Sequence, residues 1–526
     1  MLVVIVALCS ITYELIFAQA LTITFGGTVV RYSITIGLFL LFLGVGALFY
    51  RFLNLENIKR NFVLVELALC LVGPVGLFFI IGLNSVAYQP FYSEYGYWVL
   101  LVLSHLPIAL VGLLSGLELP LLSDLSEQEN GAFSTTLGFD YIGSLIGTVV
   151  YALYLYPELG LIKTAVIVGA LNLLAAILFI VLSAQSTAKP IIAVTVLVAV
   201  VYTGLWLDIE RIEDRTYKAY YAKVIQDDYW SMDDEVDGIE VTEYYRTPYQ
   251  EVIFYNVYRS YSDSADRCMN LDKHVQMCTS WVQDYHHGLI DVPMAYLGSD
   301  KKVQPKVLLI GGGDWLPVKQ LLPYQVTIDH VDIDRRFTEL TKSHSLLRSL
   351  HQQAFYYQGL KTHYEDGYAF LKNAQEKYDL IVLDLPGLLS DKLIHFYSEE
   401  FFYFVIDALS QDGLVVTWGY PKDSFYDHYQ ALMTTLYQAG FRDYLEYSAY
   451  DDNGQPGETF YLLRHPETNN LPVADYSSSK YIDRHREKYI DQNEWDVILP
   501  TDQPSNSIFH PNKSIVIRKP VRFGGL

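Results

Sequence analysis

Cysteine and basic residues are scarce in this chain of 526 residues. The four cysteines, at positions 9, 70, 268 and 278, form no CxxC or Cys/His pattern with zinc spacing. We therefore expect neither a disulfide framework nor a structural metal. Lysine and arginine number 37 against 59 acidic residues, for a formal net charge of −22. Such acidity disfavours nucleic acid, whose phosphates would be repelled. It is compatible with a cationic partner, or simply with solubility.

Charge is sparse in the first 207 residues, which carry 6 Lys+Arg and 10 Asp+Glu, against 31 and 49 in the remainder. Apolar runs long enough to cross a bilayer occur there instead. A cleaved signal peptide would account for only the first of them. We therefore predict a transmembrane domain of about seven helices over residues 1–207. The predicted spans lie near 2–24, 33–50, 62–83, 97–121, 136–156, 162–184 and 190–207.

Four acidic residues lie within or beside these spans. Intramembrane acids are costly and usually face a protein interior or water. They indicate either a polar pathway or pocket for a cation, or polar contacts that lock the helices together. These residues are Glu14, Glu66, Glu118 and Asp140.

The sequence gives conflicting indications of topology. The segment from Arg51 to Arg60 is the clearest basic loop, so the positive-inside rule places it in the cytoplasm. Seven spans would then put the soluble part outside. Because nucleotide-type cosubstrates are cytoplasmic, we favour a multi-pass protein of the cell membrane with a cytoplasmic soluble domain.

The remainder of the chain has the pattern of an α/β protein. Residues 208–300 are rich in tyrosine, and residues 249–259 are typical of a strand in a small β-hairpin subdomain. Strand and helix patterns alternate over residues 301–465, which predicts a Rossmann-like, doubly wound, mostly parallel sheet of the class I methyltransferase type. Residues 466–526 form a polar C-terminal extension.

A run of three glycines carries the clearest functional signal. The strand-like segment VLLI leads directly into Gly311, Gly312 and Gly313, as in a nucleotide-binding βαβ unit. The full GxGxxG spacing is missing and no Walker lysine follows, so the glycines alone are a weak signal. The next predicted strand ends at Asp332, which is placed to hydrogen-bond ribose hydroxyls.

Acids follow the predicted strands of this domain. Ligands of open α/β sheets bind beyond the carboxyl ends of the strands. Several acids converging there disfavour a phosphate and favour a cation, such as a nucleoside that carries a sulfonium centre. These acids are Asp314, Asp332, Asp366 and Asp384.

Taken together, the motifs resemble spermidine synthase and related aminopropyltransferases, in particular their membrane-bound branch. TPYQEVIF, LDKHVQ and DYHHGL resemble the family's YQ strand, LDGxxQ hairpin and YHE helix. GGGDW stands for GGGDG, HVDID for VEID, EDGYAFL for DGxxFL, and YDLIVLDLPG for YDxIIxDxxDP. The apolar segments SITYELIFAQ and FDYIGSLIGTVVYALYLYPELGL are similar to the membrane part of that branch.

The resemblance implies an enzyme of polyamine biosynthesis. It would transfer an aminopropyl group from decarboxylated S-adenosylmethionine to a polyamine such as putrescine and release methylthioadenosine, with neither cofactor nor metal. Relatives are often dimers or tetramers, which makes a homo-oligomer one arrangement to expect. The implied roles are nucleoside binding for Gln250 and Asp332, adenine binding for Asp366 and Gly367, amine binding for Asp314 and His286, and proton acceptance for Asp384.

Departures from the family pattern concern the acceptor side. Gly387 stands where the family has a second acid, and Trp315 replaces a glycine and could narrow the site. His287 replaces the glutamate of the YHE helix. Two alternatives therefore stay open: an S-adenosylmethionine-dependent transferase with another group or acceptor, and a membrane polyamine sensor or transporter without catalysis.

Overall fold

The computed structural model divides the chain into two compact units, Met1–Tyr244 with Pro520–Leu526, and Tyr245–Lys519. The residues that the structure describes are 1–25, 28–52, 57–86, 94–128, 131–182, 189–230, 236–272, 274–297, 304–386, 391–419, 422, 425–468, 472–492 and 494–515. The predicted boundary at residue 207 coincides with the end of a helix, and the division between the units falls inside the next strand.

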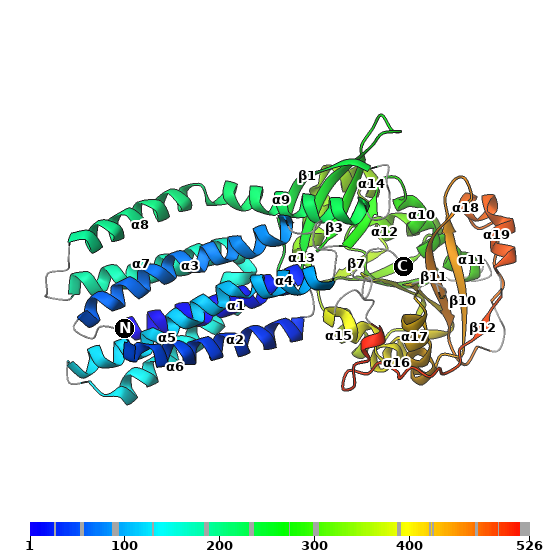
Figure 1. Cartoon of the computed structure of the whole chain (residues 1–526). Coiled ribbons are helices and arrows are strands. Elements are labelled where there is room, and N and C mark those ends of the chain that lie inside the picture. Colours follow the sequence, from blue (N-terminus) through cyan, green and yellow to red (C-terminus); the bar gives the residue numbers. More distant parts are fainter. Residues whose placement is uncertain are drawn as a thin grey trace. The chain divides into compact units, whose positions relative to one another are not determined.

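Up to Trp230, the described residues of the first unit form helices (Figure 1). The helices are α1 (Leu2–Phe25), α2 (Thr28–Phe49), α3 (Ile58–Val86), α4 (Glu94–Ser104), α5 (Leu106–Gln128), α6 (Phe133–Val150), α7 (Gly160–Leu182), α8 (Lys189–Leu207) and α9 (Ile209–Trp230), with a 3-10 turn at Tyr50–Phe52 and a π-helical stretch at Tyr151–Leu159.

Six stretches of the described chain are long and apolar enough to cross a membrane. Two predicted spans, 136–156 and 162–184, fall in one of these stretches, the 50 residues Phe133–Leu182. The chain reverses direction inside this stretch, as a hydrogen bond from the Thr164 hydroxyl to the Leu155 carbonyl oxygen at 3.0 Å shows. Nine residues of continuous α-helix would separate these groups by about 13 Å. Gly160, with φ 79°, makes the turn, so α6 and α7 are separate antiparallel helices.

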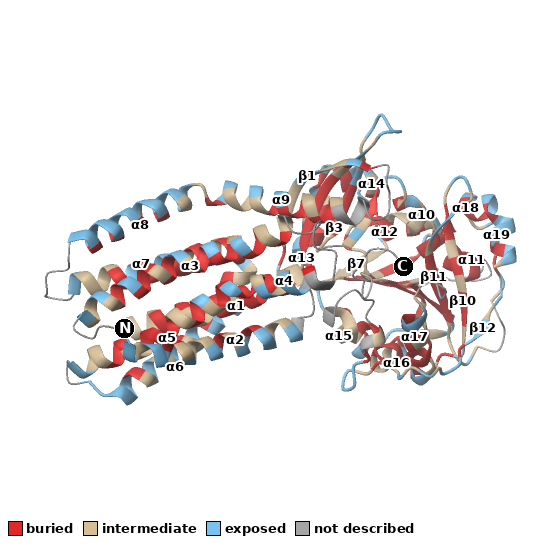
Figure 2. Ribbon diagram, viewed as in Figure 1, coloured by how far each residue is buried: buried red, intermediate tan, exposed pale blue. Residues whose placement is uncertain are grey.

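Large apolar side chains cover the outside of these helices. Much of α8 is exposed (Figure 2). Its exposed side chains include Val196, Leu197 and Val200. In water an apolar surface of this extent would be a liability, whereas hydrocarbon chains accommodate it. The six stretches are therefore compatible with a membrane protein.

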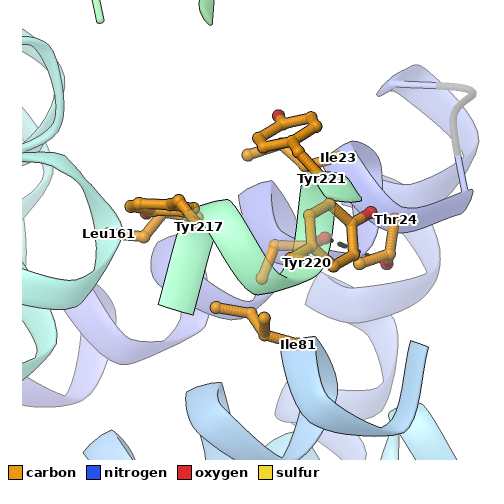
Figure 3. Close-up of a pocket in the computed structure, with 8 residues that line it drawn as sticks. Ile23, Thr24, Ile81, Leu161, Tyr217, Tyr220 and Tyr221 are labelled. Carbon is orange, nitrogen blue, oxygen red and sulfur yellow. Dashed lines mark hydrogen bonds between the residues drawn. The ribbon is translucent and has the colours of Figure 1, made fainter. Parts of the chain in front are cut away.

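Helix α9 is a correction to the expected β-rich pattern after residue 208. Its buried side chains recur at helical spacing, at Tyr217, Tyr220, Tyr221, Val224 and Ile225. The three tyrosines line a small cavity of about 10 Å³ together with residues of α1, α3 and α7 (Figure 3). This volume holds at most one water molecule, so the tyrosines serve to pack α9 within the first unit.

A four-stranded sheet in the order β1-β2-β3-β4 follows. Its strands are β1 (Val236–Arg246), β2 (Glu251–Arg259), β3 (Asp266–Leu271) and β4 (His274–Cys278). The expectation of no disulfide framework missed one bond, since Cys268 and Cys278 are joined. They lie directly opposite each other on antiparallel β3 and β4, with Cα atoms 4.0 Å apart. This register was not evident from the cysteine spacing.

The main sheet has eight strands in the order β12-β10-β11-β9-β8-β5-β6-β7. Strands β9, β8, β5, β6 and β7 are parallel, whereas β11, β10 and β12 are antiparallel. Its strands are β5 (Lys306–Gly311), β6 (Thr327–Val331), β7 (Leu360–His363), β8 (Tyr378–Asp384), β9 (Leu409–Gly419), β10 (Asp443–Tyr450), β11 (Pro456–Arg464) and β12 (Asp496–Val497). The predicted Rossmann-like sheet is confirmed.

Helices cover both faces of this sheet, so its central strands are apolar throughout (Figure 1). On β5, Val307 and Leu309 enter one core, whereas Leu308 and Ile310 enter the other. The remaining helices are α10 (Val282–His286), α11 (Val292–Leu297), α12 (Leu316–Leu321), α13 (Arg335–Ser343), α14 (Ser345–His351), α15 (Gly367–Lys372), α16 (Glu399–Ala408), α17 (Tyr426–Ala439), α18 (Lys480–Arg484) and α19 (Arg486–Asp491), with a π-helical stretch at His287–Asp291 and short 3-10 turns.

Strands β5 and β8 define the topological switch point. From β5 the chain proceeds outward to β6 and β7, and from β8 it proceeds the other way to β9. The carboxyl ends of these two strands therefore bound the crevice in which doubly wound folds bind ligands.

Candidate active site

The three predicted glycines lie at the carboxyl end of β5. Gly311 and Gly312 have φ values of 83° and 72°, which L side chains rarely adopt. A Cβ on Gly311 would lie 2.0 Å from the carbonyl oxygen of Asp384, and one on Gly313 would lie 2.5 Å from Asp332 Oδ2. Because Gly311 and Gly313 have no side chain, the turn can pack directly against Asp384 and Asp332, two of the predicted acids.

Asp314 closes the turn, and its Oδ1 accepts a hydrogen bond from the backbone N–H of Leu316 at 3.0 Å. Burial raises the pKa of Asp314 to about 6, because the carboxylate loses hydrating water.

Trp315 does not narrow the site, so that expectation was wrong. Its side chain is 1% exposed and its indole N–H donates to the Thr338 carbonyl oxygen at 3.1 Å, within the core that contains Val318. The backbone of Trp315 is left-handed, with φ 69°. A left-handed conformation favours glycine, which explains how the two residue types can occupy this position.

Asp384 ends β8 and is paired in register with Gly311. The Tyr285 hydroxyl donates to Asp384 Oδ1 at 2.8 Å. Burial and the nearby Asp314 carboxylate raise the pKa of Asp384 to about 6, whereas His286 and the Tyr285 hydrogen bond oppose the rise. Tyr285 was not among the predicted site residues. The only signal for it was its place beside His286 in DYHHGL.

His286 presents a lone pair rather than a proton to its surroundings. Its Nδ1 lies 2.6 Å from the Val282 carbonyl oxygen, which can only accept, so Nδ1 carries the proton. Burial lowers the pKa of His286 and keeps the ring neutral. Among the described residues, its buried Nε2 has no hydrogen-bond partner. Nε2 is therefore an available acceptor.

His286, Asp314 and Asp384 converge. One ligand atom from each lies within 4.8 Å of the others, a spacing at which the three could hold a cation. Three hydrogen-bond acceptors at this spacing suit either an ammonium group or a metal ion. The neighbouring His287 is directed elsewhere, with Nδ1 2.5 Å from Asp291 Oδ2.

The nucleoside-side residues are linked through Asp334, the last residue of the HVDID motif, which was not among the predicted site residues. Asp334 caps α13 by accepting from Phe337 N at 3.0 Å, and its other oxygen accepts from Gln250 Nε2 at 3.1 Å. Asp334 N in turn donates to Asp332 Oδ1 at 2.7 Å. Burial, together with the charges of Asp334, Asp314 and Asp384, raises the pKa of Asp332 to about 7. Gln250 and Asp332 thus belong to one hydrogen-bonded chain.

Packing of the small sheet holds Gln250 in this position. Val252, Phe254 and Met269 of β2 and β3 share a core with Phe337 of α13 and Leu346 of α14. Gln250 immediately precedes β2. The same apolar contacts that fix the sheet therefore place its amide beside α13.

Asp366 and Gly367 begin α15, on the far side of β5 from Asp384. Asp366 Oδ1 accepts from Ala369 N at 2.9 Å, and His395 Nε2 lies 3.9 Å from its other oxygen. The interaction with His395 lowers the pKa of Asp366, so this acid stays ionised. A Cβ on Gly367 would lie 2.6 Å from Ile310 Cγ2, which explains the glycine.

A further acid, Glu458 of β11, was missed because no motif surrounds it. Its Oε2 accepts from the Trp418 indole N–H at 2.7 Å. Burial raises the pKa of Glu458, and its charge raises that of Tyr285 in turn, so it lies near the site. Gly387, where the family has a second acid, lies outside the described residues.

Comparison with known proteins agrees with this geometry. Residues 283–447 match the spermine/spermidine synthase domain. Polyamine aminopropyltransferase 2 of Aquifex aeolicus is 29% identical over 447 residues, covering 82% of this chain and 81% of that protein. Polyamine aminopropyltransferase of Oceanobacillus iheyensis is 27% identical, covering 78% and 75%. Matches of this extent are longer than the part after residue 207 and therefore include apolar helices.

Among solved structures, spermidine synthase from Thermotoga maritima matches with a TM-score of 0.39 and 17% identity, covering 48% of this chain and 84% of that one. A spermidine synthase in complex with the transition-state analogue AdoDATO matches with a TM-score of 0.36 and 18% identity, covering 50% and 80%.

The sheet topology, the acids at its switch point and the matched domain lead to one conclusion. Residues 283–447 carry a spermine/spermidine synthase domain, and the chain is similar over most of its length to polyamine aminopropyltransferases.

Proposed function

We propose that the protein transfers an aminopropyl group from decarboxylated S-adenosylmethionine to a polyamine and releases methylthioadenosine. The observation that carries this proposal is the convergence of His286, Asp314 and Asp384 within 4.8 Å at the switch point. These groups offer acceptors to a cationic amine and include one carboxylate that can take its proton.

The reaction needs a neutral amine in line with the sulfonium carbon. The lone pair of the amine nitrogen forms the new C–N bond while the C–S bond breaks. The two electrons of the C–S bond leave with sulfur, which becomes a neutral thioether. Asp384 takes the proton that the amine loses. No acid is needed for the leaving group. Holding both substrates in line supplies much of the remaining acceleration.

The other residues bind and orient. His286 Nε2 and Asp314 accept hydrogen bonds from the amine, and the Tyr285 hydroxyl holds Asp384 in position. Asp332 and Gln250 bind the ribose side of the nucleoside, and Asp366 with Gly367 binds the adenine side. The raised pKa values of Asp314, Asp332 and Asp384 support a cationic ligand, because a positive charge stabilises their ionised forms.

Glu458 is our candidate for the distal charge of the acceptor. Its carboxyl is held by Trp418 and lies close enough to Tyr285 to influence it electrostatically. A diamine such as putrescine would present one amine to Asp384 and the other to a second acid. Glu458→Gln should raise KM for the diamine more than KM for the nucleoside.

The decisive experiment compares wild type with Asp384→Asn in purified full-length protein. Decarboxylated S-adenosylmethionine and a panel of amines are supplied, and methylthioadenosine and the alkylated amine are measured by mass spectrometry. Undiminished turnover by the variant would refute the role of Asp384. Preference for intact S-adenosylmethionine would favour the transferase alternative, since Asp314 should repel its carboxylate.

A membrane sensor or transporter of polyamines is the second candidate, motivated by the buried acids of the helical unit. Polyamine flux into proteoliposomes without cosubstrate would support it. Release of methylthioadenosine would show that transport is not the whole function.

We place the protein in the cell membrane with its second unit in the cytoplasm, where the cosubstrate is found. The Cys268–Cys278 disulfide is of a kind found mainly in oxidising compartments, so it opposes this placement. Labelling of these thiols in intact and permeabilised cells is the test. Free thiols accessible only after permeabilisation would support the cytoplasmic side, and an intact disulfide would refute it.

A further inference from the structure

The helical unit contains a buried polar cluster that the proposed transferase reaction does not use. Glu66 of α3 is 0% exposed, Glu118 of α5 is 3% exposed, and Asn172 of α7 is 0% exposed. Asn172 Nδ2 donates to Glu66 Oε2 at 2.9 Å. The Glu66 and Glu118 carboxyl groups interact directly, and the Ser115 hydroxyl lies beside Glu118. Three helices thus bring four oxygen-bearing side chains together.

The cluster has too few donors for its acceptors. Four buried oxygens of this cluster have no hydrogen-bond partner among the described residues: Glu66 Oε1, Glu118 Oε1, Asn172 Oδ1 and Ser115 Oγ. The described part of the chain also provides neither carboxyl with an ion pair to lysine, arginine or histidine. Asp140, a further charge that acts on Glu118, is also negative.

Two facing carboxylates without a counter-charge are strongly disfavoured away from water. One shared proton would relieve the repulsion between Glu66 and Glu118. It would not give Asn172 Oδ1 a partner, because this oxygen needs a donor or a cation of its own. A bound metal ion would satisfy the carboxylate oxygens and the amide oxygen together.

From this arrangement we infer that Glu66, Glu118 and Asn172 bind one hard metal cation in the core of the helical unit, with Ser115 beside it. Carboxylate, amide and hydroxyl oxygens are the ligands of Na⁺, K⁺, Mg²⁺ and Ca²⁺ rather than of zinc or copper. The two carboxylates balance a divalent charge, which favours Ca²⁺ or Mg²⁺ within this class.

The test uses the full-length protein in detergent, freed of metals with a chelator. Thermal unfolding is followed by tryptophan fluorescence with each chloride salt in turn, at ionic strength held constant with choline chloride. A saturating cation should raise the unfolding temperature by about 5 °C. Glu118→Gln and Asn172→Ala should lose most of this shift.

Glu14→Gln is the matched control, because Glu14 is a buried acid of α1, 4% exposed, for which no interaction with Glu66 or Glu118 is found. It should keep the full shift. Titration calorimetry should give one ion bound per chain for wild type and for this control.

If Glu118→Gln and Asn172→Ala do not fold, Asn172→Asp provides a second test. A third carboxylate should make the apparent affinity for Ca²⁺ or Mg²⁺ at least tenfold tighter and lower the unfolding temperature without the ion. Stability that responds to pH but to none of the four cations would overturn the inference, as would equal shifts in wild type and Glu118→Gln.

Discussion

The two buried acid clusters of this protein differ in what surrounds them. At the carboxyl ends of the main sheet's strands, here called the sheet edge, strand ends and helix starts leave backbone N–H groups free. These N–H groups donate to Asp314, Asp332 and Asp366. In the helical unit, backbone N–H groups are engaged within the helices. There the side-chain amide of Asn172 donates a hydrogen bond to the Glu66 carboxylate. A sheet edge can therefore stabilise transient charge, whereas a helical bundle needs a bound cation or proton.

The largest expected effect is on catalysis at the sheet edge. Asp384→Asn should lower kcat by about 10²- to 10⁴-fold, because the amide cannot accept the amine proton. Steady-state assays of methylthioadenosine release would measure the loss. Glu118→Gln, in the other cluster, should leave kcat within about twofold if the two clusters act separately. A similar loss in both variants would break the comparison.

Glycine positions provide the second contrast. Gly311→Ala should destabilise the protein by more than about 1 kcal/mol, since its φ is 83° and a Cβ would lie 2.0 Å from the Asp384 carbonyl oxygen. In α6, a Cβ on Gly138 meets nothing within 4 Å. Gly138→Ala should therefore be neutral or stabilising by up to about 1 kcal/mol. Thermal unfolding of both variants would test this, and equal effects would contradict the close approach of β5 and β8.

The pH dependence of the sheet-edge cluster follows from its raised pKa values. Asp384, with a pKa of about 6, must be ionised to act as base. kcat/KM should therefore fall about tenfold per pH unit below pH 6. A flat profile between pH 5 and 7 would argue against a titrating carboxylate as the base.

Unliganded stability should change in the opposite direction. Between the unfolded pKa of 3.8 and the folded value of about 6, the native state of Asp384 binds more protons than the unfolded state. Stability from this group is therefore complete below about pH 4 and lost as pH rises through 6. Asp314 acts with the same sign, as does Asp332 up to about pH 7. Cosubstrate should accordingly stabilise the protein more at pH 8 than at pH 5.5.

The smallest effect concerns Tyr285. Its hydrogen bond opposes the rise in the Asp384 pKa. Tyr285→Phe should move the acid limb of the kcat/KM profile to higher pH and reduce kcat by about tenfold or less. Tyr324→Phe is the matched control, since its hydroxyl donates to Asp291 Oδ1 at 2.7 Å in another tyrosine–aspartate pair. An unshifted profile in Tyr285→Phe would show that this bond only positions the side chain.

Local pattern predicted most of the fold. Apolar runs located the helical unit, because length and hydropathy are properties of contiguous residues. The apolar strands of the main sheet were recognisable for the same reason. The tyrosines of α9 were misread, although their spacing at Tyr217, Tyr220 and Tyr221 is helical.

At the candidate site, the sequence by itself determined which residues stand at strand ends: Asp314, Asp332, Asp366 and Asp384. Only the tertiary structure decided what they meet. Tyr285, Asp334 and Glu458 join the site, Trp315 turns into the core, and Cys268 faces Cys278. These outcomes depend on strand register and on packing between distant segments. Both are set by the summed contacts of the whole core, which no local sequence pattern contains.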